Sequence, residues 1–282
     1  MGKEWDDLSE FSVEKEIQEV ERKNLLIVDG NNLAYRYYNR PNFDNYYDDY
    51  VKTITSLGKS YSAKKIICTF DSGSLYRKTI FPEYKANRDI ERTEEEQERY
   101  EAFFDCLNEI IDSLPFDNYR FKGVEADDLI AYLALNSDFD TTWIISSDRD
   151  LYQLLNSKTK IYNIFSRKEI TVTSLKEKYN LTPMEYMWMR IIEGDKGDNI
   201  NGIDGIGEKR ATALIKDFGS LRDLIEALPI KGKAKYIANL NAGKESLILY
   251  EKLMNLKDYN TVALSYAQSD NIMEILNNAS KQ

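Results

Sequence analysis

Histidine is absent from this chain of 282 residues, and its absence excludes several kinds of active site. Without histidine the chain cannot form a Ser-His-Asp triad, a Cys-His nucleophile or a histidine-ligated zinc site. Cysteine is nearly absent too, with Cys68 inside an apolar run and Cys106 inside a helical pattern. Two such thiols are typical of buried cysteines in a reducing compartment, so a disulfide framework is excluded as well.

Long apolar runs are also missing. No stretch approaches the roughly 20 apolar residues that a membrane-spanning helix needs. The N-terminal sequence MGKEWDDLSEF is acidic and polar, which is unlike a signal peptide. Asp6 stands where a myristoylation signal has Ser or Thr. We therefore expect no membrane association and a cytoplasmic location, in the host cytoplasm if a phage encodes the chain.

Positive charge is in deficit, with 38 Lys and Arg against 48 Asp and Glu and a formal net charge of −10. This balance argues against a general surface for polyanions. A nucleic-acid partner would therefore have to be held by local basic patches or through metal ions. The length suits one large or two modest domains with a buried core.

Short apolar runs alternate with helical patterns in the first part of the chain. The runs 25–28, 66–70 and 143–145 predict strands that are buried on both faces. Helical patterns cover residues 12–23 and 44–60. Strands that alternate with helices predict an α/β fold with a mainly parallel sheet.

An acidic residue follows each of these three runs. Asp29, Asp71 and Asp148 all come at the carboxyl ends of predicted strands, where ligands bind in open α/β sheets. Aspartate also favours turns, so three separate turn residues are the alternative interpretation. The coincidence of three acids at one edge favours a site.

The stretch 123–150 (GVEADDLIAYLALNSDFDTTWIISSDRD) is unusually rich in acids at both ends. Each acid alone would be an ordinary helix cap, because a helix N-terminus attracts negative charge. Together they repel: two like charges about 4 Å apart cost roughly 4 kcal/mol at an effective dielectric near 20. Such a cluster persists if the acids diverge into water, share protons or bind cations, and cation binding is our hypothesis.

Residues 72–114 lie between the second predicted strand and these acids. The segment begins with basic and aromatic residues, including Lys85 and Arg88, and continues as a helix over about 92–113. The first half of that helix has no apolar face, which is typical of a solvent-exposed helix. The segment is either a solvated surface excursion or a mobile cover that brings Lys85 and Arg88 over a bound phosphate.

From about residue 173 the pattern becomes almost entirely helical. A helix with a capping box and an N-terminal proline runs from Pro183 to Gly194, and the acidic loop GDKGDN follows. The glycine-rich sequence GIDGIGEKR then leads into a helix at 211–218, with Lys209 and Arg210 at its start. Free N–H groups and basic residues in such a place favour phosphate binding. From residue 268 onward we expect an ordinary tail.

Seven motifs in this order resemble the 5′-nuclease, or flap endonuclease, superfamily. They are VDGNNLAYR, TFD, PEYKANRD, GVEADDLIA, ISSDRD, GDKGDN and GIDGIGEKRA. The chain is most similar to phage-type 5′→3′ exonucleases and to the 5′-nuclease domain of bacterial DNA polymerase I. The resemblance implies a PIN-like α/β nuclease core, a helical arch, and a helical C-terminal region with a helix–three-turn–helix.

The domains expected from this resemblance are an N-terminal helical extension at 1–23, a nuclease domain at 24–175 that includes the arch at 72–114, and a helical DNA-binding region at 176–282. The function implied is structure-specific hydrolysis of DNA at 5′ flaps and 5′ ends, with RNA primers as a further substrate class. We expect a monomer.

The resemblance also implies two or more Mg²⁺ or Mn²⁺ ions, which suit oxygen ligands and would activate water and stabilise the leaving oxygen. One metal group would contain Asp71, Glu125, Asp127 and Asp128, with Asp29 close by. The second group would contain Asp148, Asp150, Asp195 and Asp198. A K⁺ ion at the helix–three-turn–helix is a further implied cofactor.

Lys85 and Arg88 would act on the scissile phosphate by stabilising charge in the transition state. Tyr84 would stack on a base near the cut. The other DNA contacts implied, all without sequence reading, are Arg36, Gly205, Gly207, Lys209 and Arg210.

Two alternatives remain open at this point. A PIN-like metal-dependent RNase shares a carboxylate cleft but needs neither the glycine hairpin nor the arch. A catalytically silent DNA-binding protein of the same fold would keep the acids without use, although an unused cluster only adds repulsion.

Overall fold

The computed structural model describes residues 23–40, 43, 45–88 and 92–282. The helix expected at 12–23 therefore lies outside the described residues, except for its last position. The strands are β1 (Asn24–Asp29), β2 (Ala63–Thr69), β3 (Asp117–Tyr119), β4 (Thr141–Ile145), β5 (Thr159–Asn163) and β6 (Lys168–Ile170). The sheet order is β3-β2-β1-β4-β5-β6, with all neighbours parallel except the antiparallel pair β5–β6. The predicted α/β fold with a mainly parallel sheet is confirmed.

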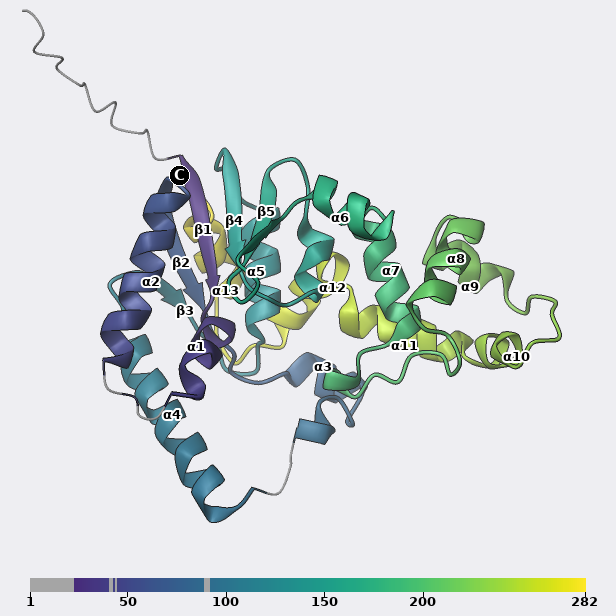
Figure 1. The fold of residues 1–282 in the computed structure, drawn as a ribbon, viewed down its shortest axis with the longest axis horizontal. Coiled ribbons are helices and arrows are strands. Elements are labelled where there is room, and N and C mark those ends of the chain that lie inside the picture. Colours follow the sequence, from purple (N-terminus) through teal and green to yellow (C-terminus); the bar gives the residue numbers. More distant parts are fainter. Residues whose placement is uncertain (1–22, 41–42, 44, 89–91) are drawn as a thin grey trace, which may run out of the picture.

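The helices flank this sheet and extend from one end of it (Figure 1). They are α1 (Gly30–Tyr38), α2 (Tyr46–Ser60), α3 (Leu75–Ile80), α4 (Glu94–Ser113), α5 (Ala126–Leu135), α6 (Val172–Tyr179), α7 (Pro183–Glu193), α8 (Glu208–Phe218), α9 (Leu221–Ala227), α10 (Lys235–Ala242), α11 (Lys244–Met254), α12 (Leu256–Ser265) and α13 (Ile272–Ala279). No helix in this described part of the chain is both long enough and apolar enough to cross a membrane.

The central position of β1 in the sheet explains why its sequence is continuously apolar. Successive side chains of a strand point to opposite faces. Leu25 and Ile27 join one hydrophobic core, which includes residues of α5, α12 and α13. Leu26 and Val28 join the other, which includes residues of α1, α2 and α4. The sheet is thus the middle layer of three, and the carboxyl ends of its parallel strands meet at one edge.

The segment between β2 and α5 leaves the sheet and returns to it. Its long helix α4 begins at a capping box, in which Thr93 and Glu96 exchange hydrogen bonds. The buried residues of α4 all lie at Phe103 or beyond it, so the apolar face predicted for the later part of this helix is confirmed. The first half projects away from the sheet (Figure 1).

Helices α7 to α11 form the region on the opposite side from α4, with α8, α9 and α10 farthest away (Figure 1). Helix α7 starts at a capping box between Thr182 and Glu185, with Pro183 in its first turn. Helix α8 starts at Glu208, three residues earlier than expected. The boundary expected between residues 175 and 176 falls inside α6.

The expectation of an ordinary tail from residue 268 is wrong. Residues 272–279 form α13, which packs against α5 and buries Ile272, Leu276 and Ala279. The spacing of these three residues is helical, four and then three apart, so one face of the helix is apolar. The C-terminal segment therefore belongs to the core.

Candidate active site

Asp29 is the last residue of β1 and also caps α1. Its Oδ1 accepts the backbone N–H of Asn32 at 3.1 Å, and its Oδ2 accepts the hydroxyl of Ser146 at 2.7 Å. The side chain is buried at the edge of the sheet. Burial, with help from the nearby Asp71, raises the pKa of Asp29 to about 7. The fold thus places a carboxyl group with a raised pKa at the end of β1.

Six other carboxylates converge with Asp29 on one cavity of about 250 Å³. The seven acids that line it are Asp29, Asp71, Asp127, Asp148, Asp150, Asp195 and Asp198. They come from the ends of β1, β2 and β4, the first turn of α5, and the loop after α7. Asn31, Asn32 and Tyr35 of α1 complete the same wall, although the sequence did not single them out. The structure therefore brings together seven of the nine acids expected to bind metal.

Asp127 is the acid of this cavity with the least support from other side chains. No hydrogen-bond donor or cation among the described residues contacts its carboxylate. Burial and the neighbouring acids, chiefly Asp148 and Asp29, raise its pKa well above the usual range. An acid in this state needs a proton or a cation.

Glu125 and Asp128 do not line the cavity, because the buried guanidinium of Arg77 holds them. Arg77 binds Asp128 through two contacts of 2.6 and 2.9 Å and Glu125 through one of 2.9 Å. Burial alone would raise the pKa of Glu125, but Lys85 and Arg77 outweigh it and lower the pKa to about 2. The expected part of Asp128 in a metal site has no support in this geometry, since both its oxygens are occupied.

Lys85 and Arg88 line the same cavity as the acids. Lys85 Nζ contacts Glu125 and lies 4.0 Å from Asp198, while Arg88 Nη2 lies 2.5 Å from Asp198. Burial would lower the pKa of Lys85, but the carboxylates of Glu125 and Asp198 raise it instead. Both side chains therefore remain cations within the cavity.

The geometry of Tyr84 gives no support to the expected stacking on a base, which stays a prediction. Tyr84 is 3% exposed, and its hydroxyl donates to Asp198 at 2.9 Å or to Glu125 at 3.2 Å. Its ring faces the core, so neither face is open to a nucleobase. An aromatic residue in a polar segment looks exposed in the sequence, but here its hydroxyl ties the cover to the acids.

Arg190 is a site residue that the sequence analysis missed. It lies in α7, and its guanidinium contacts Asp150 at 3.1 Å and Asp195 at 2.5 Å. Burial raises the pKa of Asp150 to about 7, with Asp148 adding to the effect and Arg190 opposing it. The available signal was an arginine inside the apolar run MWMRII, since buried arginines are usually paired.

The loop that carries Asp195 and Asp198 is anchored by glycine. A Cβ on Gly202 would come within 2.1 Å of the carbonyl oxygen of Glu193, and φ at Gly202 is +65°. The backbone on either side of the loop can approach this closely only without a side chain. Asp195 and Ile200 form a backbone bridge across the loop, which holds the two acids against the sheet edge.

The residues expected to contact DNA elsewhere lie outside this cavity. Gly207 caps α8 and faces open space, while Gly205 has a left-handed backbone with φ of +80°. Arg210 donates to the carbonyl of Gly205 at 2.5 Å, and its guanidinium stacks over Tyr236. Lys209 is exposed at the same helix start. Arg36 belongs to a second cavity on the other side of α1.

The chemistry of the acid cavity fits hard divalent cations. All its acidic donors are oxygen atoms, with seven carboxylates against the two cations Lys85 and Arg88. In the described residues no three acidic or cysteine side chains form a ready-made cage for an ion. Ions would therefore bind with much of their own water, as Mg²⁺ usually does.

Two family models match consecutive parts of the chain. The model of the 5′-3′ exonuclease N-terminal resolvase-like domain matches residues 24–180, and that of the 5′-3′ exonuclease C-terminal SAM fold matches residues 181–276. The chain belongs to the 5′-3′ exonuclease family. The predicted placement in the 5′-nuclease superfamily is confirmed.

Relatives in this family include a flap endonuclease of Escherichia phage T5, with 38% identity covering 96% of this chain and 95% of the relative. A 5′-3′ exonuclease of Buchnera aphidicola is 31% identical, covering 84% of this chain and 87% of its own. The DNA polymerase I of Bacillus subtilis is 32% identical over 84% of this chain but only 28% of the polymerase.

Solved structures of the family agree with the fold. The T5 D15 protein co-crystallised with metal ions has a TM-score of 0.85 and 37% identity, covering 91% of this chain and 98% of that one. A complex of the T5 flap endonuclease with DNA and metal ions has a TM-score of 0.86, covering 91% and 97%. The catalytic core of Rad2 with DNA, at 15% identity, a TM-score of 0.53 and coverage of 92% and 91%, shows the shared fold alone.

Proposed function

We propose that this 5′-3′ exonuclease family member is a divalent-metal-dependent, structure-specific nuclease that hydrolyses DNA at 5′ flaps and 5′ ends. The observation that carries the proposal is the cavity in which seven carboxylates lie beneath Lys85 and Arg88. A phosphodiester is an anion, so acids alone would repel it. Divalent cations and the two basic side chains would reverse that charge and give the phosphate a place to bind.

The metal ions would be held by the acids in two groups that share the cavity. Asp29, Asp71 and Asp127 form one group. Glu125 lies next to this group and is paired with Lys85. The other group contains Asp148, Asp150, Asp195 and Asp198. Mg²⁺ or Mn²⁺, when bound, supplies Lewis-acid stabilisation of developing negative charge and lowers the pKa of water at the site. Asp128 is left out of this proposal because Arg77 occupies it.

The side chains of the cover would act on the reacting phosphate. Lys85 Nζ reaches Glu125, so its ammonium already lies beside the acids and within the cavity. A cation in that position stabilises charge that develops in the transition state. Arg88 can bind two phosphate oxygens at once, because its guanidinium presents paired donors. Neither side chain needs to read the base sequence.

The DNA duplex would be held away from the cut by the start of α8, where Gly207 leaves the helix N-terminus open and Lys209 adds positive charge. Arg36 would add a contact on the other side of α1. A K⁺ ion at the helix–three-turn–helix, activity on RNA primers, a monomeric state and a cytoplasmic location stay predictions.

The test is a cleavage assay on a 5′-labelled flapped DNA duplex. With Mg²⁺ or Mn²⁺ we expect short labelled products from cutting near the junction, and none with a chelator. The same flap made of RNA tests the alternative of an RNase, and Asp148→Asn provides the inactive control. Cleavage of the RNA substrate alone would contradict the proposal, and so would binding without cleavage in every divalent ion.

A further inference from the structure

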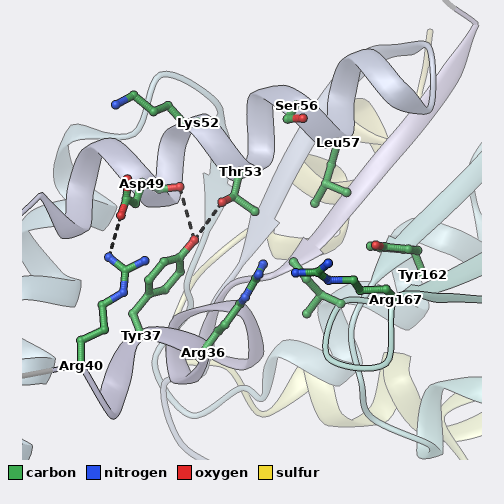
Figure 2. Close-up of a pocket in the computed structure, with 11 residues that line it drawn as sticks. Arg36, Tyr37, Arg40, Asp49, Lys52, Thr53, Ser56, Leu57, Tyr162 and Arg167 are labelled. Atoms are coloured by element: carbon green, nitrogen blue, oxygen red, sulfur yellow. Dashed lines mark hydrogen bonds and ion pairs between the residues drawn. The ribbon is translucent and has the colours of Figure 1, made fainter.

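A second cavity lies on the other side of α1 from the acids, between α1, α2 and the turn that joins β5 to β6 (Figure 2). Its volume is about 460 Å³. Four cations surround it: Arg36 from α1, Arg40 from just beyond the end of α1, Lys52 from α2, and Arg167 from the turn. We call these four residues the α1–α2 basic pocket.

The positive charge of the α1–α2 basic pocket is largely uncompensated. Asp49 is the acid in its lining, and Arg40 already uses it through a contact of 2.6 Å. Among the described residues, no hydrogen bond or ion pair satisfies Arg36, Lys52 or Arg167. Arg36, Lys52 and Arg167 are exposed, and in a chain with a net charge of −10 they form a local basic patch that suits an anionic ligand.

The arrangement of the side chains points to the same conclusion. The guanidinium groups of Arg36 and Arg167 approach each other across the cavity although they come from different elements (Figure 2). Like charges so placed repel each other, and an anion bound between them would turn this repulsion into attraction. Arg167 also has a φ of 54°, in the left-handed region that favours glycine, so its side chain is kept at some cost in backbone strain.

The floor of the pocket is suited to a phosphate. The ring of Tyr37 is fixed there by hydrogen bonds from its hydroxyl, which lies 2.9 Å from that of Thr53. Ser56 and Tyr162 add hydroxyl groups to the lining. Arginine forks and hydroxyl donors together match the tetrahedral oxygens of a phosphate.

The position of the pocket favours a nucleic-acid phosphate over a free one. Arg36 follows Asp29 by seven residues of α1, about 10 Å along the helix axis, on the order of three nucleotides at about 3.4 Å each. Phe165, in the same turn as Arg167, is 53% exposed, and exposed aromatic rings beside cations are typical of surfaces that bind nucleic-acid strands. Asn32 and Tyr35 of the same helix line the acid cavity.

We propose that the α1–α2 basic pocket is a phosphate-binding subsite that holds a phosphodiester of the DNA substrate a few nucleotides from the one that is cut. This inference rests on the proposed function. It assigns roles to Lys52 and Arg167, and it gives Arg36 a defined ligand. Because α1 lines both cavities, the subsite sets the distance between a held phosphate and the acids.

The first measurement is binding of a labelled flapped duplex in Ca²⁺ at several salt concentrations. The variant Arg36→Gln/Arg167→Gln is expected to bind about tenfold more weakly near 0.1 M salt, with a log–log salt slope smaller by about one unit. Lys59→Gln/Lys158→Gln removes the same charge from the end of α2 and from just before β5, outside the pocket, and should bind normally. Arg36→Lys/Arg167→Lys should recover most of the slope. Equal losses in the first two variants would overturn the subsite.

The second measurement locates the held phosphate. Flapped duplexes carry one neutral methylphosphonate at each successive position from the cut. In the wild-type protein one position a few nucleotides away should weaken binding, and that loss should vanish in Arg36→Gln/Arg167→Gln. If the effects of the methylphosphonate and of the double substitution simply add at every position, the proposal is contradicted.

Two further outcomes distinguish the DNA subsite from a site for free phosphate and from the proposed function. If pyrophosphate stabilises the wild-type protein but not the variant, while the methylphosphonate series shows no coupled position, the pocket takes free phosphate and the DNA subsite is wrong. If the coupled position is found but Mg²⁺ and Mn²⁺ produce no cleavage, the proposed function fails and the subsite stands.

Discussion

Arg77 holds both carboxylate oxygens of Asp128, with Nη1 2.6 Å from Oδ2 and Nη2 2.9 Å from Oδ1. Its Nε also donates to the carbonyl of Leu253 at the end of α11, so one arginine joins α3, α5 and α11. Asp127, the preceding residue, faces the acid cavity instead. Two adjacent acids in one sequence motif thus have different surroundings.

This difference predicts opposite effects of two neighbouring substitutions. Asp128→Ala leaves Arg77 buried with Glu125 as its remaining carboxylate, and loss of one partner from a buried pair costs on the order of 3 kcal/mol. Asp127→Asn removes like-charge repulsion and should leave the metal-free protein equally or more stable, while it abolishes cleavage. Urea unfolding with a chelator and single-turnover assays with Mg²⁺ measure both effects. Similar stability in the two variants would contradict the different roles of Asp127 and Asp128.

Lys85→Ala tests the cover. Loss of one donor that stabilises the transition state typically costs about 10²–10³ in rate. We expect that fall in single-turnover cleavage, with DNA affinity in Ca²⁺ nearly unchanged. Lys78→Ala, an exposed cation of α3 outside the cavity, is the matched control. A variant with an unchanged rate and weaker binding would place Lys85 in DNA docking alone.

The acids also predict how stability depends on pH without metal. Asp29 and Asp150 have pKa values of about 7, above the unfolded value near 3.9. The folded state holds these protons more tightly, so their contribution to stability is complete below about pH 4 and is lost as the pH rises through 7. Glu125, with a pKa of about 2, acts in the opposite sense and loses its contribution in acid below about pH 4.

Melting temperatures in chelator should therefore fall between about pH 5 and pH 8. Divalent ions should reduce the fall, because they bind the ionised acids and so stabilise the folded state. In Asp150→Asn the slope should be smaller, since one of the titrating groups is gone. A melting temperature that rises steadily over this range would show that the raised pKa values do not govern stability.

The start of α8 gives a further prediction. Lys209→Ala/Arg210→Ala should weaken binding of all duplex-containing substrates alike and reduce the salt slope by roughly one unit for each DNA phosphate that these side chains no longer bind. Single-turnover cleavage at saturating protein should change much less. Lys64→Ala/Lys158→Ala removes equal charge at the N-terminal ends of β2 and β5, away from α8, and should have little effect on binding. If the slope is unchanged, this loop does not contact the DNA.

The last prediction concerns α13, whose packing the sequence analysis missed. Leu276 is fully buried against the core, so Leu276→Ala should cost about 2–5 kcal/mol of unfolding free energy. Met273 on the same helix is 37% exposed, and Met273→Ala should stay within about 0.5 kcal/mol. Equal effects, measured by urea unfolding, would mean that the helix is not docked as described.

Patterns along the chain predicted those features that depend on local sequence. The runs that became β1, β2 and β4 are apolar because both faces are covered, and Asp29, Asp71 and Asp148 could be placed at one edge from that fact alone. The strands β3 and β6 contain three residues each and carry little apolar signal. Short edge strands of this kind are defined by their partners.

Pairs of side chains that are distant in sequence were beyond such reasoning. Arg77 meets Asp128 across 51 positions, and Arg190 meets Asp150 across 40. Composition alone cannot tell an acid that faces a cavity from one that is neutralised by a buried arginine. For the same reason Tyr84 was assigned to a base, although its hydroxyl donates a hydrogen bond to Asp198, 114 positions away.

The contacts of Lys85, Arg88 and Arg190 with the acids have a consequence for how ions would enter. These three side chains are counterions that belong to the chain and never diffuse away. Uptake of a divalent ion is then an exchange, in which a carboxylate changes partners, and not the filling of an empty space. An apparent ion affinity would report the difference between the contacts that the carboxylates make with the ion and those that they make with these side chains. Substitutions of Lys85 or Arg88, which hold Glu125 and Asp198, would therefore alter it.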